Sequence, residues 1–219
     1  MRLWPQPIAS SQRWRADPAM LGNSLLLLAA LAGAVLLFRH SDAAAEAPKS
    51  QLQVASLSLI FLALAAMGRL LLVSVDQDIV TLQRLLDNLA LYAGLPLLVT
   101  AALAMAMGWY WSKAGWGRWL LALFALFELC RRMGLGEDYT LWLSVVMAVV
   151  LLVVAWRQQG TLSRLATAIA APLLLLSISA PALMVAELAD TARLLAQAIA
   201  ILLLSHALLQ QNPRTLPTQ

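Results

Sequence analysis

The segment LQVASLSLIFLALAAMGRLLLVSV, residues 52–75, is long enough to cross a bilayer and carries a single charge, Arg69. On a helix, the residues three and four positions from Arg69 are all apolar, so the segment offers no counter-ion. Because the apolar run continues for six residues beyond it, the guanidinium is expected about 9 Å below the membrane interface. The segment therefore predicts a transmembrane helix whose arginine needs a partner from another helix, from lipid headgroups or from water.

The whole chain has the composition of a membrane protein. Hydrophobic residues make up 62% of the 219 residues and charged residues 12%, against roughly 45–50% and about 25% in soluble domains. The basic residues are scattered beside apolar runs, as loop anchors at a headgroup surface are, which argues against nucleic-acid binding. We therefore expect the lipid bilayer to be the solvent of this chain.

Seven apolar runs predict an all-α, polytopic transmembrane helical bundle. The run at residues 117–131 is the weakest, since its purely apolar part is short and Glu128 and Arg131 lie near its end. Seven spans are expected, with six as the alternative. The seven runs are residues 20–38, 52–75, 85–109, 117–131, 140–156, 164–188 and 192–210.

The sequence divides into a basic interfacial tail at 1–18, a single bundle at 19–210 and a polar tail at 211–219. A cleaved signal over residues 1–45 is the alternative for the first run, but the charged and polar residues 39–42 argue against it. The compact chain and its short loops favour a bacterial inner membrane.

The charges do not fix the orientation in the membrane. Seven Lys and Arg residues fall on each side under the seven-span topology, so the positive-inside rule gives no answer. The acidic residues are uneven, with nine on the amino-terminal side and two on the other. This asymmetry predicts that acidic side chains gather around an opening at one end of the bundle.

A layer of polar residues is expected near that end. Asp87 is the first choice of partner for Arg69, because the second and third helices are consecutive and antiparallel, and Glu128 is the second choice. Charged residues three or four positions apart can also pair along one helix, which would make them self-neutralising helix ends. The candidate layer comprises Arg69, Asp87, Asn88, Glu128, Arg131 and Glu187.

Two helices carry residues that interrupt regular hydrogen bonding. Gly94 and Pro96 lie in the third run, and Pro172 and Pro181 lie in the sixth. Proline removes a backbone donor, and broken helices of this kind line the substrate site in many transporters. These four positions are therefore candidate helix interruptions of a transport site, although proline and glycine are common in membrane helices.

The remaining polar residues do not indicate a chemistry. His206 in the last run is expected to make a polar contact between helices. The chain has one cysteine, and its two histidines are far apart, so neither a metal site nor a bound cofactor is predicted. Both lysines lie in loops, which excludes a retinal Schiff base in the last helix.

Three classes of function follow. The favoured one is a non-enzymatic accessory or assembly subunit that packs against a membrane-protein partner, or a homo-oligomer, because each charged feature has a structural explanation. The second is a small transporter or channel with a solute or proton site at the interrupted helices. An intramembrane enzyme is the least supported, since no nucleophile accompanies the carboxylates.

Overall fold

The computed structural model describes residues 18–42, 44, 46–72, 76–179 and 186–211 of the chain. These residues form α1 (Pro18–Asp42), α2 (Glu46–Leu71), α3 (Gln77–Leu89), the π-helical turn η1 (Ala90–Gly94), α4 (Leu95–Met107), α5 (Lys113–Arg132), α6 (Gly136–Arg157), α7 (Thr161–Ser179) and α8 (Ala186–Gln211). Because α3, η1 and α4 follow one another without a break, the described residues form seven long helices. The prediction of an all-α bundle is confirmed.

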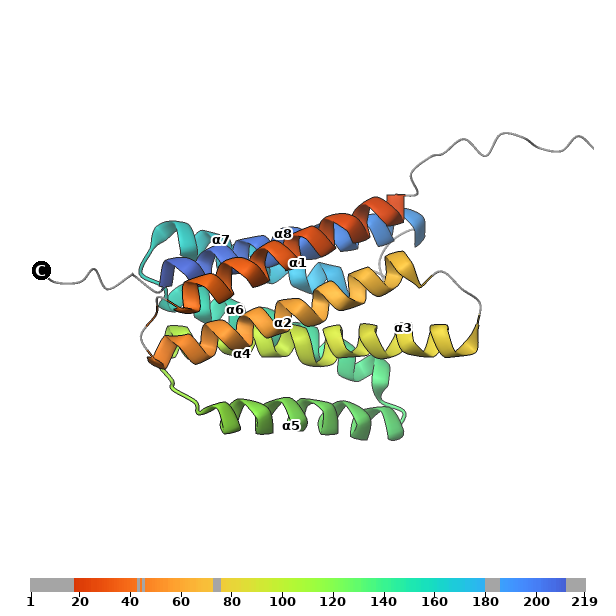
Figure 1. Ribbon diagram of the computed structural model, residues 1–219, viewed down its shortest axis with the longest axis horizontal. Coiled ribbons are helices and arrows are strands. Elements are labelled where there is room, and N and C mark those ends of the chain that lie inside the picture. The colour runs from red at the N-terminus through yellow and green to blue at the C-terminus, as the bar shows by residue number, and fades with distance from the viewer. Residues whose placement is uncertain (1–17, 43, 45, 73–75, 180–185, 212–219) are drawn as a thin grey trace, which may run out of the picture.

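The helices run side by side along the long axis of the molecule, and α5 lies along one edge (Figure 1). The first helix packs against α2 and α8, α7 packs between α6 and α8, and α4 contacts α2 and α6. When α3, η1 and α4 are counted as one helix, each helix runs antiparallel to the next one along the chain (Figure 1). The result is one bundle with no separate extramembrane domain among the described residues.

Small residues bring the helices close together. Ala30, Ala55, Ala66 and Ala200 are completely buried at helix contacts of the core. A Cβ added to Gly33 of α1 would lie 2.6 Å from Ser205 Oγ of α8 and 2.7 Å from Leu59 Cδ1 of α2. Close backbone approach is how helices associate in a membrane, where lipid tails are as apolar as leucine.

Six helices in the described part of the chain are long and apolar enough to cross a membrane, and α5 is not one of them. The prediction of seven spans is therefore confirmed only as far as six. The reason is the one expected from the sequence, since α5 carries Lys113 and Arg118 near its start and three charged residues near its end.

Some helix boundaries differ from those predicted. The second helix ends at Leu71 and not at 75, and α3 begins at Gln77. The third helix starts eight residues earlier than predicted, in a polar stretch. This part of α3 extends beyond the ends of the neighbouring helices (Figure 1). The sixth helix ends at Ser179 and not at 188, and the last begins at Ala186.

Candidate functional site

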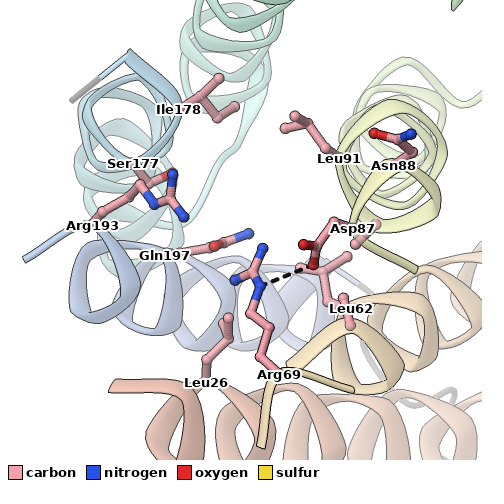
Figure 2. A pocket seen from close by; sticks show the side chains of 12 residues that line it. Leu26, Leu62, Arg69, Asp87, Asn88, Leu91, Ser177, Ile178, Arg193 and Gln197 are labelled. Carbon is pink, nitrogen blue, oxygen red and sulfur yellow. Dashed lines mark hydrogen bonds and ion pairs between the residues drawn. The ribbon is translucent and has the colours of Figure 1, made fainter. Parts of the chain in front are cut away.

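Arg69 and Asp87 form an ion pair between α2 and α3. Arg69 Nε donates to Asp87 Oδ1 at 2.9 Å (Figure 2). The pairing expected for this arginine is thus present, while its position within the helix differs from the one expected. Arg69 lies two residues before the end of α2 and not six, since the helix stops at Leu71. Its charge there also interacts favourably with the carbonyl end of the helix dipole.

The packing of α2 on α3 explains why the two side chains meet. A Cβ added to Gly68 would lie 2.9 Å from Leu86 Cδ1, so the helices touch one residue away from both partners of the ion pair. The side chains of Arg69 and Asp87 remain 24% and 34% exposed. The pair is therefore partly accessible to the surroundings of the bundle.

A cavity of about 120 Å³ adjoins the ion pair. Its walls come from five parts of the bundle: α1, α2, the α3–η1 segment, α7 and α8 (Figure 2). At about 30 Å³ for each water in the liquid, the space corresponds to roughly four waters. The polar residues that line it are Arg69, Asp87, Asn88, Ser177, Arg193 and Gln197.

The cavity presents hydrogen-bond donors that the described residues do not use. A guanidinium has five N–H groups, and Arg69 gives only Nε–H to Asp87. Its two outer nitrogens point into the cavity beside the amide of Gln197 (Figure 2). Arg193, one helical turn before Gln197 on α8, lines the same space and has an interaction partner of its own.

The structure brings only part of the predicted layer together. Asn88 lines the cavity next to Asp87. Glu128 and Arg131 lie on α5, where the carboxylate accepts hydrogen bonds at 2.8–2.9 Å from Arg131 and at 2.8 Å from Arg132. Glu128 is thus neutralised along its own helix and is not a wall of the cavity. Glu187 lies in the first turn of α8, but its side chain is outside the described residues.

The predicted helix interruption in the third run is a π-helical turn and not a break. The Leu95 N–H donates to the carbonyl of Ala90, five residues earlier, and Pro96 begins the next α-helical stretch. A Cβ on Gly94 would lie 2.7 Å from Leu62 Cδ1 and 3.3 Å from the Ser58 carbonyl oxygen. A larger residue here would force the Leu62 side chain and the backbone of α2 at Ser58 to shift. Turns of this kind occur often at functional sites, and Ala90 and Leu91 also line the cavity.

The same turn directs Tyr92 toward α5 and α6. Its hydroxyl lies 2.7 Å from Thr140 Oγ1. Because Thr140 donates its own proton to the Gly136 carbonyl, Tyr92 is the donor in this contact. The Tyr92 ring also stacks on Phe127 of α5, with centroids 3.9 Å apart. The π-helical turn therefore connects the cavity side of the bundle to α5.

The sixth run is not interrupted within the described residues. α7 continues through Pro172 to Ser179, and Pro181 lies outside the described residues. His206 is exposed on α8, and its expected contact between helices stays a prediction. No group of His, Cys, Asp or Glu among the described residues is arranged to hold a metal ion.

Sequence reasoning did not identify Ser177 and Gln197 as cavity residues. One feature of the sequence could have identified Gln197. It lies four residues after Arg193, which places both on one face of a helix. Ser177 had none, because a serine in an apolar helix usually bonds its own backbone, as this one does to Leu174.

The fold and cavity define an integral, multi-pass membrane protein of the all-helical class. No protein-family model, curated protein or solved structure matches the chain.

Proposed function

We propose that the protein is a non-enzymatic accessory or assembly subunit of a bacterial inner membrane, and that α5 is the helix that contacts its membrane partner. The observation that carries the proposal is the combination of weak hydrophobicity and one-sided packing in α5. Three steps support it: the path of α5, its surface and its charges.

The path of α5 supports a seventh crossing of the membrane. Trp119 Nε1 donates to Thr100 Oγ1 at 3.2 Å, while Phe127 stacks on Tyr92. Trp119 contacts residue 100, and Phe127, further along α5, contacts residue 92, which is earlier in the chain. Helix α5 is therefore antiparallel to the continuous helix made of α3, η1 and α4. Both α4 and α6 run in the direction opposite to α5 (Figure 1). If they cross the membrane, the helix between them crosses it too.

The surface of α5 is packed on one side only. Trp116 and Leu123 are its only buried residues. On the other side, Leu121 is 69% exposed and Leu129 is 56% exposed. Between these leucines lie exposed small residues, Ala122 and Ala125, over which a partner helix can approach closely.

The charges of α5 favour a protein neighbour over lipid. Charged side chains within a membrane helix are rare and face protein or water, since each costs roughly 2.5–3.5 kcal/mol at the bilayer centre. Arg118 is exposed on the same side as Leu121. Near the C-terminal end of α5, Glu128 forms ion pairs with Arg131 and Arg132. A second protein against this side would shield such a helix better than lipid tails.

The proposal is tested by photo-crosslinking in intact membranes. A photoreactive phenylalanine analogue is placed at Leu121 of α5 and, as the matched control, at Leu28 of α1, which is 64% exposed. We expect one discrete protein adduct from Leu121 and only lipid adducts from Leu28. An adduct of twice the chain's own mass would replace the accessory role with a homo-oligomer. Lipid adducts alone at Leu121 would exclude a partner on this side.

A small transporter or channel is the second candidate function, and the cavity beside Arg69 is the observation that favours it. The cavity holds ionised and amide side chains within the bundle and adjoins the π-helical turn. Flux across liposomes that contain the purified protein would test this function. A flux equal to that of protein-free liposomes, for ions and small polar solutes, would exclude it.

A further inference from the structure

We infer that the cavity beside Arg69 binds an oxyanion, the carboxylate or phosphate group of a small molecule or of a lipid headgroup. The inference deepens the second candidate function, because it names the class of ligand for that cavity. It does not depend on a partner for α5.

The first step is the geometry of Arg69. Its pairing with Asp87 uses Nε and one carboxylate oxygen. The two outer nitrogens, which together carry four N–H groups, have no acceptor among the described residues. These nitrogens form the end-on fork of the guanidinium, and that fork matches two oxygens of a carboxylate or phosphate.

The second step is the position of Asp87. The carboxylate holds the guanidinium at its Nε edge, so the fork is fixed in direction before any ligand arrives. A pre-oriented arginine binds an anion with less loss of side-chain freedom than a mobile one. Asp87 thus neutralises part of the charge of Arg69 and also directs its two outer nitrogens into the cavity (Figure 2).

The third step is the opposite wall. Gln197 presents its amide beside the fork, and Arg193 reaches the same space from one turn earlier on α8 (Figure 2). Asn88 adds a second amide from α3. Donors from two sides of the cavity therefore converge on the space that an anionic group would fill, and charge-assisted hydrogen bonds of this kind are the strong ones.

The volume sets an upper limit on the ligand. About 120 Å³ accommodates one carboxylate or phosphate group with a few waters. A larger molecule, such as a phospholipid, would insert only its headgroup and leave the rest outside. Because Arg69 lies in the last turn of α2, near the end of the bundle, a headgroup has a short path to reach it.

The test measures thermal unfolding of the full chain in a neutral detergent, followed by tryptophan fluorescence. In one arm, sodium phosphate or acetate replaces sodium chloride at constant ionic strength. In the other arm, phosphatidylglycerol is added to the micelles, with phosphatidylcholine as the lipid control. At a tenfold excess over Kd, we expect Tm to rise by about 3–5 °C. A response to the free anions identifies a soluble ligand, and a response to phosphatidylglycerol alone identifies a headgroup.

Two variants assign the response to the cavity. Gln197→Leu removes one donor and narrows the cavity, while Arg69→Lys keeps a charge for Asp87 and removes the fork. Both should lose the rise in Tm. The control is Gln210→Leu, an exposed glutamine near the other end of α8 that does not line this cavity, and it should keep the full rise.

The inference is overturned if neither free anions nor phosphatidylglycerol raises Tm in the wild-type protein, or if Gln197→Leu and Arg69→Lys respond as the wild type does. Binding without flux would leave the oxyanion site standing and remove only the transport function. Flux without an effect of anions on Tm would support the transport function and remove the oxyanion site.

Discussion

Arg69 occupies a position in which three favourable interactions coincide. It pairs with Asp87, it lies at the carbonyl end of a helix, and its outer nitrogens face a polar cavity. The last turn of a membrane helix is also where a long basic side chain reaches polar surroundings most readily. Three interactions therefore hold this side chain at the end of α2.

Removing either partner of this ion pair should destabilise the protein. We expect Arg69→Ala and Asp87→Ala each to lower the free energy of unfolding by about 1–3 kcal/mol, because the remaining charge loses its partner while only partly exposed. Arg132→Ala, at an arginine that is 76% exposed, should cost less than about 1 kcal/mol. Unfolding in detergent, followed by tryptophan fluorescence, measures all three.

The exchange of the two residues separates pairing from position. The double variant Arg69→Asp and Asp87→Arg should recover part of the loss, but not all of it, since an aspartate at the end of α2 opposes the helix dipole. Complete recovery would mean that the dipole contributes nothing. A double variant no more stable than Arg69→Ala would show that pairing is not what holds α2 against α3.

The pairing of Arg69 could be predicted from sequence because two consecutive antiparallel helices must bring some of their residues to the same level. The end of α2 could not, because the apolar residues after Arg69 look the same whether they continue a helix or leave it. Gln197 was missed as a cavity residue for a related reason. A single amide in an apolar helix does not reveal which of its neighbours it faces.

The third helix shows how one turn of unusual geometry serves two contacts. The π-helical turn places Gly94 against α2 and Tyr92 against α5 and α6. An extra residue in a turn shifts the face that the following residues present. The turn thus sets the angular relation between the cavity half of the bundle and α5.

Glycine at position 94 should be much harder to replace than glycine at position 117. Gly94→Ala would put a Cβ 2.7 Å from Leu62 Cδ1 and 3.3 Å from backbone at Ser58, and we expect a loss of about 1–3 kcal/mol. Gly117→Ala on α5 meets nothing within 4 Å and should be neutral or stabilising by up to about 1 kcal/mol. The two variants are compared by thermal unfolding. Equal effects would mean that α2 does not pass Gly94 closely.

Helix existence was predictable at the element scale, while helix ends and the π-helical turn were not. Long apolar runs fix where a helix must be, because the bilayer leaves the backbone no other partner. The start of α3 lies in a polar stretch, Gln77–Arg84, that hydrophobicity cannot detect. Proline and glycine in the third run marked the right place, but the geometry depends on how α2 packs against it.

The path of α5 makes a topological prediction for the whole molecule. In a Cys130→Ala background, cysteines are introduced at Tyr110→Cys before α5 and at Met133→Cys after it, both at exposed positions. If α5 crosses the membrane, a membrane-impermeant maleimide should label the two from opposite sides. Gln159→Cys is the control and should label from the same side as Tyr110→Cys, since residues 105 and 106 share a cavity with the α6–α7 connection. Labelling of positions 110 and 133 from one side would leave six crossings.

The contact between the first helix and the last has a consequence for biosynthesis. Helix α1 packs against α2 and α8, and its Gly33 meets Ser205 on α8. A ribosome therefore has to synthesise α8 before α1 gains its second neighbour. Until then the side of α1 that carries Gly33 is exposed to lipid and to the proteases that degrade unassembled membrane helices. A chain truncated before α8 should therefore be short-lived in the cell.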